Sequence, residues 1–220
     1  MAKAAGTRRK ERRASSDTRE HVLDVAHDLF YWTGIRATGV DRVAAEAGIA
    51  PTALYRLFPS KDALVAAYVE RAAGRYREWF DEATRADGRP AALRVVALFG
   101  ALAERVKPEV CRGCPFIMAV TEFPEDEAEC HRAAVRLKEW VRGRFRSLAA
   151  EVAAEAPHRH FEPASLADHL TLLFEGVYAT VPTLGASGPA RGARDFAAAL
   201  VGVGPPSRRR GRARTHPDAL

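Results

Sequence analysis

The chain has 220 residues, of which 47% are hydrophobic, 8% are aromatic and 28% are charged, and it contains three cysteines. This length supports a sizeable core, and the composition excludes a wholly disordered chain, a disulfide-stapled miniprotein and a collagen-like fibre. No apolar run approaches the ~20 residues that a bilayer-spanning helix needs, since the longest run, residues 95–103, ends at Glu104. The N-terminus has no apolar stretch typical of a secretory signal, and the cysteine number is odd, so we expect a cytoplasmic protein.

The positive charge is concentrated at the two ends of the chain. Residues 1–13 carry +5 and residues 204–220 carry +4 of the formal net charge of +6, so the 190 residues between them sum to −3. We expect a disordered basic arm at 1–16 and a disordered basic tail at 204–220. Such ends attract polyanions, nucleic acid first. For the tail, a solvated end that only aids solubility is an equal alternative.

The apolar residues of the N-terminal third follow helical spacing. Asp17 and Glu20 are spaced as in a capping box, which predicts a helix from Asp17 that ends at Gly34. A short helix is predicted from residue 39 or 40 to Gly48. A third begins at Pro51, because the first helical position does not need the missing N–H. It ends near Pro59, and a long fourth helix runs from about residue 60 into the 80s.

The remainder of the chain is also predicted to be helical. Further helices are expected at about 90–107, 115–122, 125–155, 163–183 and 190–201, divided by proline, glycine and histidine clusters. No segment alternates apolar and polar residues in the manner of a strand. The predicted fold class is therefore all-α.

Residues 38–61 have the spacing of a helix-turn-helix unit. Gly48 lies where the turn needs a positive φ, and an apolar lock between the helices is formed by Val43, Ala47, Ile49, Leu54 and Leu57. In such a unit the second helix enters the major groove of DNA and its first residues face the bases. Here these residues are Pro51, Thr52, Ala53 and Arg56, with Tyr55 able to reach a phosphate or a thymine methyl group. An ordinary helical hairpin within a core uses the same spacing and is the alternative.

Residues 17–80 also resemble the N-terminal domain of the TetR-type (TetR/AcrR) transcriptional regulators. The matching motifs are Phe-x-x-x-Gly at Phe30–Gly34, Val-Asp-x-Val-Ala-x-x-Ala-Gly at Val40–Gly48, and the Leu54, Tyr55, Phe58, Lys61 and Leu64 series. The resemblance implies a bacterial helix-turn-helix DNA-binding domain at 17–62 and a helical effector-binding and dimerisation domain at 63–203. It implies a homodimeric repressor that binds a double-stranded DNA operator and is released from it by a small-molecule effector. The candidate DNA contacts, from the resemblance and from the groove argument together, are Thr38, Arg42, Thr52, Ala53, Tyr55, Arg56 and Lys61.

Two positions depart from the family pattern. The family has Ser or Thr where this chain has Gly39, and Ser where it has Ala50. Each of those family residues caps the following helix, and replacing a capping Ser by Ala costs ~1 kcal/mol. We therefore expect a fold that is retained but a recognition helix whose N-terminus is less firmly held.

The C-terminal two thirds offers a candidate dimer surface. An apolar stripe follows Pro163, and it consists of Leu166, Leu170, Leu173, Phe174, Val177 and Val181. Phe196, Ala199 and Leu200 lie on the last helix. The resemblance implies that the last two helices, about 163–201, pair with those of a second copy as a four-helix bundle. The alternative is a stripe that packs inside one protomer.

The same region offers candidates for an effector pocket, which are Phe99, Cys114, Phe116, Met118, Glu122, Trp140, Phe174 and Tyr178. They are apolar or amphipathic enough to line a ligand site, although any helical bundle needs such residues for its core. Glu122 lies on a short apolar segment and could orient a polar or cationic ligand, or point into solvent.

The cysteine motif Cys111-x-x-Cys114 could be a redox pair or half of a zinc site. The other candidate zinc ligands are Cys130, His131, His158 and His160, and their spacing fits no zinc pattern. We therefore expect packing residues and neither a metal nor a cofactor.

Two other functional classes are weaker. The sequence has neither a Gly-x-Ser-x-Gly nucleophile elbow nor a phosphate-binding loop, so we do not expect an enzyme. A DNA binder that uses its basic ends without sequence preference is the remaining alternative.

Overall fold

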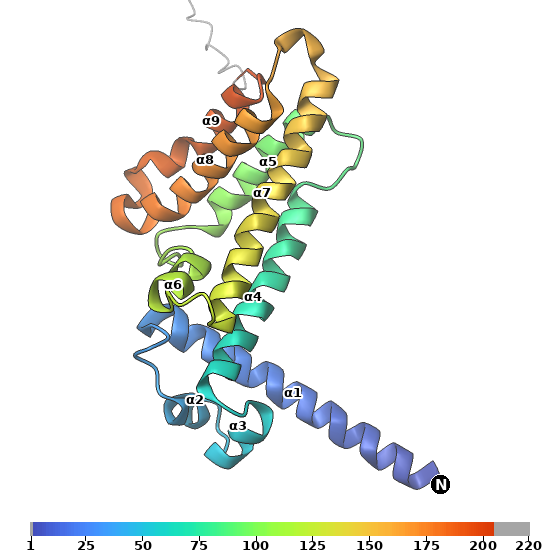
Figure 1. Ribbon diagram of the computed structural model, residues 1–220, viewed down its shortest axis with the longest axis vertical. Coiled ribbons are helices and arrows are strands. Elements are labelled where there is room, and N and C mark those ends of the chain that lie inside the picture. The colour runs from blue at the N-terminus through green and yellow to red at the C-terminus, as the bar shows by residue number, and fades with distance from the viewer. Residues whose placement is uncertain (1, 205–220) are drawn as a thin grey trace, which may run out of the picture.

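The computed structural model describes residues 2–204, with side chains from residue 16 onward, and within this range it is all-α, as predicted (Figure 1). The helices are α1 (Ala2–Thr33), α2 (Val40–Glu46), α3 (Pro51–Leu57), α4 (Lys61–Ala83), α5 (Ala91–Arg105), α6 (Pro115–Glu122), α7 (Glu129–Glu155), α8 (Pro163–Leu184) and α9 (Ala193–Leu200). Short 3-10 turns occupy Pro157–Arg159, Gly185–Ser187 and Pro189–Gly192. Beyond Gly204, the predicted basic tail lies outside the described residues.

The first helix begins earlier than the sequence pattern predicted. Helix α1 starts at Ala2, so Asp17 lies inside a continuous helix and does not cap its N-terminus. The segment before Asp17, residues 2–16, contains four alanines, four arginines and two lysines, which all favour helical backbone. The helix ends as predicted, because Gly34 adopts φ +106° directly after Thr33.

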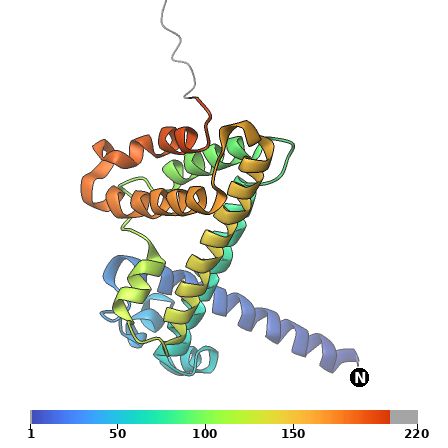
Figure 2. The same cartoon turned by 45° about the horizontal axis from the view of Figure 1, so that its top comes forward.

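Two long helices set the shape of the molecule. Helices α4 and α7 run side by side from the end that holds α1, α2 and α3 to the end that holds α5, α8 and α9 (Figures 1 and 2). The predicted domain boundary at residues 62 and 63 lies within α4, so one continuous helix connects the two ends. Ion pairs join α7 to its neighbours, including Arg144 Nη2 to Asp81 Oδ1 of α4 at 3.0 Å and Arg142 Nη2 to Asp168 Oδ1 of α8 at 2.8 Å.

We call the end that holds α5, α8 and α9 the larger end of the molecule. Its core is a cluster of aromatic rings. Phe174 of α8 lies at its centre, 6.0 Å from Phe80, 5.9 Å from Phe99 and 5.5 Å from Phe145 between ring centroids. All four rings are fully buried. Edge-to-face pairs of this kind add about 0.5–1.5 kcal/mol each to the burial of apolar area, which fixes how α4, α5, α7 and α8 pack together.

The apolar stripe of α8 faces the protomer's own core and not a partner. Its buried members are Leu166, Leu170, Phe174, Val177 and Val181, and Leu173 packs against the same core. The expectation that this stripe forms a dimer surface is therefore wrong, because α8 needs that face to cover α7. The large apolar side chains that α8 and α9 leave exposed are Leu172, Leu184 and Phe196.

No helix in the described part of the chain is both long enough and apolar enough to cross a membrane.

The structure confirms that α2 and α3 lack the side-chain caps at their N-termini that the family pattern provides. Gly39 and Ala50 occupy the N-cap positions of α2 and α3 and provide no side-chain hydrogen bond, whereas Ser60 accepts one from the Ala63 N–H at 3.1 Å. Ala50 has φ −67° and ψ 144°, the extended backbone that a capping Ser adopts.

We therefore expect Ala50→Ser to raise the free energy of unfolding by about 1 kcal/mol, because the new hydroxyl can accept a bond from an N–H group in the first turn of α3. Urea unfolding followed by circular dichroism measures the change. Ala45→Ser, an exposed position inside α2, serves as the matched control and should lower stability slightly. Equal effects of the two substitutions would rule out the capping explanation.

Candidate DNA-binding and ligand-binding sites

Helices α2 and α3 form a compact helix-turn-helix unit against α1. Gly48 adopts φ +64° in the turn, and the Ile49 N–H donates to the Ala44 carbonyl at 3.0 Å. Val43, Ala44 and Leu54 are fully or almost fully buried between the helices. The predicted apolar lock is thus formed by its buried members, while Ile49 and Leu57 pack at its edge.

Four of the seven candidate DNA contacts project from the surface of this unit. They are Arg42 on α2 and Thr52, Tyr55 and Arg56 on α3, all of them exposed. The Tyr55 side chain is a large ring left 48% exposed. Ala53 is half-buried on α3, so it belongs to the edge of the same face. The exposed face therefore combines two guanidinium groups with hydroxyl donors, the groups that bind phosphates and base edges.

Thr38 does not belong to that surface. Its side chain is 0% exposed, and its hydroxyl donates to the Gly34 carbonyl at 2.8 Å. The predicted DNA contact from Thr38 is corrected accordingly, because this hydroxyl closes the turn between α1 and α2.

Lys61 lies half-buried at the first position of α4, after the Ser60 cap. Its Nζ donates to the Arg36 carbonyl in the α1–α2 turn at 3.1 Å. The ammonium group therefore supports the turn in the free protein, next to the positive end of α4 where a phosphate would be favoured.

Glu122, at the end of α6, makes its hydrogen bonds with the turn between α1 and α2. Its Oε1 accepts from the Ile35 N–H at 3.0 Å and its Oε2 accepts from the Arg36 N–H at 2.7 Å. The Arg36 side chain returns to α6, where its Nε donates to the Glu122 carbonyl at 2.5 Å and its guanidinium lies 5.0 Å from the Phe123 ring centroid. The predicted ligand contact from Glu122 is thus wrong, because two backbone N–H groups occupy its carboxylate. We call this set of contacts between Glu122 and residues 35–36 the α6 clamp.

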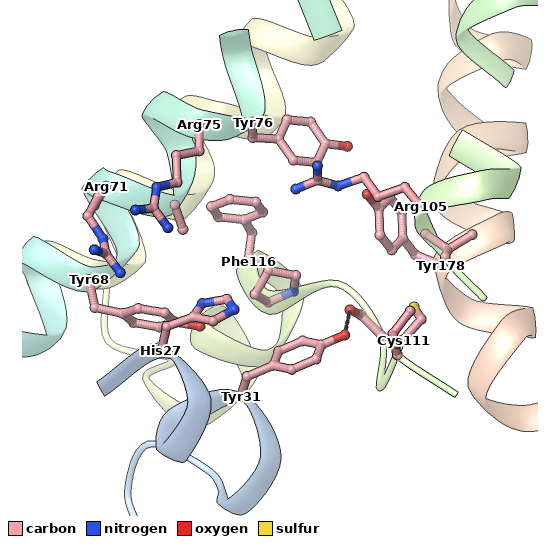
Figure 3. A pocket seen from close by; sticks show the side chains of 15 residues that line it. His27, Tyr31, Tyr68, Arg71, Arg75, Tyr76, Arg105, Cys111, Phe116 and Tyr178 are labelled. Atoms are coloured by element: carbon pink, nitrogen blue, oxygen red, sulfur yellow. Dashed lines mark hydrogen bonds between the residues drawn. The ribbon is translucent and has the colours of Figure 1, made fainter. Parts of the chain in front are cut away.

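A cavity of about 330 Å³ lies between α1 and the larger end of the molecule (Figure 3). Its lining residues come from α1, α4, α5, the α5–α6 loop, α6 and α8, and they are His27, Tyr31, Tyr68, Arg71, Ala72, Arg75, Tyr76, Arg105, Val106, Val110, Cys111, Gly113, Pro115, Phe116 and Tyr178. Of the candidate pocket residues, Phe116 and Tyr178 line this cavity.

The other candidates do not line the cavity. Phe99 and Phe174 belong to the buried ring cluster, and the Trp140 ring packs 5.4 Å from Phe80 between centroids. Cys114 is buried and Met118 is half-buried outside the lining. These residues fill the core of the helical bundle. A bundle core and a ligand site use the same types of residue.

Tyr31 connects the cavity wall to the α5–α6 loop. Its hydroxyl donates to the Gly113 carbonyl at 3.0 Å and accepts from the Arg112 N–H at 2.7 Å, while Arg112 Nη1 donates to the Tyr31 carbonyl at 2.7 Å. Burial, with the neighbouring Cys111, raises the pKa of Tyr31 to about 12. The phenol therefore stays protonated and ties α1 to the loop.

Ion pairs between α1 and α4 lie at another edge of the cavity. Arg71 Nη1 of α4 lies 2.9 Å from Asp24 Oδ1 and 3.2 Å from Glu20 Oε2, both on α1, and Arg75 Nη2 lies 3.3 Å from Asp24. Burial opposes ionisation of Asp24, but the two guanidinium groups outweigh it and lower the pKa of Asp24. Burial, with Arg71 and Arg75, also lowers the pKa of His27, which favours a neutral imidazole stacked on Tyr31.

The three cysteines are buried thiols. Cys111 lines the cavity, and Cys114 Sγ lies 3.2 Å from the Lys138 Nζ, which also pairs with both Glu175 oxygens at 2.7 Å. Within the described residues, no three His, Cys, Asp or Glu side chains gather as a metal site.

Sequence reasoning missed most of the cavity. Tyr31, Arg71, Tyr76 and Arg105 come from three different helices, and each one follows ordinary helical spacing in its own segment. The weak sequence signal is an excess of aromatic and arginine residues on α4, but the sequence does not reveal which helix faces them.

The comparisons with known proteins agree with this geometry. Residues 22–68 match the family model described as bacterial regulatory proteins, tetR family. The solved structure of SCO4454, a TetR-family transcriptional regulator from Streptomyces coelicolor, is 28% identical, with a TM-score of 0.73 over 86% of this chain and 94% of that one. A TetR transcriptional regulator from Chloroflexus aurantiacus shares the fold at 21% identity, with a TM-score of 0.72 over 87% and 98% of the two chains. No match was found among curated protein sequences.

If the α6 clamp stabilises the folded protein, removal of the Glu122 carboxylate should lower the free energy of unfolding. Glu122→Ala removes both acceptors of the Ile35 and Arg36 N–H groups, and we expect it to lower the free energy of unfolding by about 1–3 kcal/mol in urea unfolding. Glu122→Gln retains one acceptor oxygen, so its free energy of unfolding should lie between those of the parent protein and Glu122→Ala. Glu109→Ala, which removes an exposed loop carboxylate, is the control and should have no measurable effect. A Glu122→Ala protein as stable as this control would show that the clamp contributes nothing.

Proposed function

We propose that this chain, whose N-terminal domain and fold match those of TetR-type transcriptional regulators, is a homodimeric repressor that leaves its operator when a small molecule binds. The observation that carries the proposal is the exposed row of Arg42, Thr52, Tyr55 and Arg56 on a helix-turn-helix unit whose apolar residues are buried.

The DNA-binding part of the proposal rests on how α3 is presented. Helix α3 packs against α2 through Leu54, so the opposite face with Tyr55 and Arg56 is free to enter a major groove. Arg56 is suited to bidentate bonds with a guanine, and Arg42 and Lys61 are suited to phosphates.

The dimer part of the proposal rests on exposed apolar residues at the other end of the molecule. Leu172 of α8 is 71% exposed, and Phe196 of α9 is 59% exposed. Large apolar side chains on neighbouring helices are typical of a surface that a partner covers. We propose a second copy as that partner, because paired recognition helices about 34 Å apart fit successive major grooves on one face of DNA.

The release part of the proposal rests on the position of the cavity. His27 and Tyr31 of α1 form part of its wall, and α1 also packs against the helix-turn-helix unit. A ligand that fills the cavity would contact α1 and the larger end of the molecule together. It would shift the protein away from the DNA-binding state only if it binds the other state more tightly.

The DNA-binding proposal is tested with a binding site selected from a pool of random DNA. Fluorescence anisotropy should show a preference of ~10³ or more for the selected site over random duplex. Tyr55→Ala and Arg56→Ala should each weaken binding to the selected site by about 1–3 kcal/mol, because they remove contacts within the groove. Arg85→Ala, an exposed arginine after α4, is the control and should bind as the parent protein does. Equal affinity for random DNA with a steep salt dependence would favour a binder without sequence preference.

The dimer is tested by light scattering coupled to size-exclusion chromatography. We expect the parent protein to elute as a dimer and Leu172→Asp and Phe196→Asp to elute as folded monomers, because a buried unpaired carboxylate is costly. Val110→Asp makes the same kind of change at an exposed loop position and should leave the dimer intact. A monomeric parent protein at micromolar concentration would contradict this part of the proposal.

A further inference from the structure

The cavity between α1 and the larger end has walls suited to a flat ring. The Phe116 ring lies 5.5 Å from Tyr76 between centroids, and Tyr68 and Tyr178 provide further aromatic surface. A volume of about 330 Å³ is at the small end of the range for ligand pockets. Aromatic walls and a small volume together favour a compact ligand of one or two rings.

The charged side chains that line the cavity itself are all positive. Three arginines, Arg71, Arg75 and Arg105, line it, and none of its lining residues is an aspartate or a glutamate. Arg71 and Arg75 already pair with Asp24 on the α1 side. Arg105 differs, because no carboxylate among the described residues lies within 4.0 Å of its nitrogens.

Arg105 is held in place by rings and not by an acid. Its guanidinium carbon lies 5.0 Å from the Trp79 ring centroid and 5.9 Å from that of Tyr76. The cation–π contacts orient the group and leave its N–H donors available to an acceptor.

Two phenol hydroxyls lie near this guanidinium. Tyr76 is 4% exposed, and its hydroxyl makes no well-formed hydrogen bond, although the Tyr178 hydroxyl lies close enough to interact with it. Figure 3 shows the Tyr76 hydroxyl directed toward Arg105, on the side of the cavity where Tyr178 lies. Burial raises the pKa of both phenols above the ordinary value for tyrosine, so both are protonated at neutral pH and able to donate. A buried hydroxyl without a well-formed hydrogen bond is costly, and a ligand acceptor would remove that cost.

We infer that the cavity binds a small aromatic carboxylic acid as its carboxylate, with the rings against Phe116 and Tyr68 and the carboxylate between Arg105, Tyr76 and Tyr178. This assignment rests on the proposed effector-binding function and names the chemical class of the effector. A carboxylate accepts several bonds at once and pairs with a guanidinium in the bidentate manner. One available guanidinium matches a single negative charge, since Arg71 and Arg75 are already paired.

The test is isothermal titration calorimetry of the full chain with three acids and their uncharged amides. The acids are benzoate, 2-naphthoate and indole-3-acetate, and the controls are benzamide, 2-naphthamide and indole-3-acetamide. We expect at least one acid to bind with a Kd tenfold or more below that of its amide. If no acid binds below 1 mM, or if each amide binds as tightly as its acid, the inference is overturned.

Three variants locate the carboxylate. Arg105→Gln should weaken binding of the acid at least tenfold and leave the weak binding of the amide unchanged, while Arg105→Lys should restore part of the affinity. Tyr76→Phe should weaken acid binding severalfold and leave the unfolding midpoint nearly unchanged, since it removes a buried hydroxyl that makes no well-formed hydrogen bond. Arg85→Gln removes an arginine outside the cavity and should bind the acid as the parent does. Unchanged acid affinity in both Arg105→Gln and Tyr76→Phe would overturn the assignment.

The same acid, added to the DNA-binding assay, separates this inference from the proposed function. Acid binding that lowers DNA affinity supports both. Acid binding without an effect on DNA affinity supports the ligand class and contradicts effector release. Selective DNA binding by a protein that binds none of the acids leaves the regulator proposal intact and overturns the ligand class.

Discussion

The carboxylate of Glu122 joins α6 to the turn between α1 and α2. It accepts the Ile35 and Arg36 N–H groups of the turn that connects α1 to the helix-turn-helix unit. The same turn is closed from within by Thr38 and from α4 by Lys61. These bonds connect α6 to the turn that precedes α2, and hydrogen bonds to a charged acceptor are roughly twice as strong as those between neutral groups.

The cavity lies beside this joint, and its two edges have different chemistry. On the α1 side, the arginines of α4 are paired with Asp24 and Glu20, which fastens α1 to α4. On the α8 side, Arg105 lies over the rings of Trp79 and Tyr76, and the Tyr76 hydroxyl lies beside Tyr178 without a well-formed hydrogen bond. In the proposed function, a ligand bound at the second edge would act on the DNA-binding unit through α1 and the loop that Tyr31 contacts.

The ring cluster around Phe174 gives this arrangement a rigid support. Its rings fill the space between α4, α5, α7 and α8, so the apolar stripe of α8 is used inside the protomer. The residues left exposed on α8 and α9 lie on a different face, and the proposed dimer would use that face. A close-packed interior of this kind has low compressibility and transmits strain.

The sequence by itself determined the helices and the helix-turn-helix unit. Those features depend on local causes: the spacing of Val43, Ala47 and Leu54, the positive φ at Gly34 and Gly48, and the missing caps at Gly39 and Ala50. The tertiary structure alone decided what each helix faces. Periodicity showed that α8 has an apolar stripe but not which element covers it, and it gave no sign that Glu122 reaches residues 35 and 36, which precede it by more than 80 positions. Periodicity also could not predict that one cavity is lined by Tyr31, Tyr76, Arg105 and Tyr178. A helix specifies its own apolar face through bonds within one segment, whereas a site built from several segments is fixed only when the helices pack against one another.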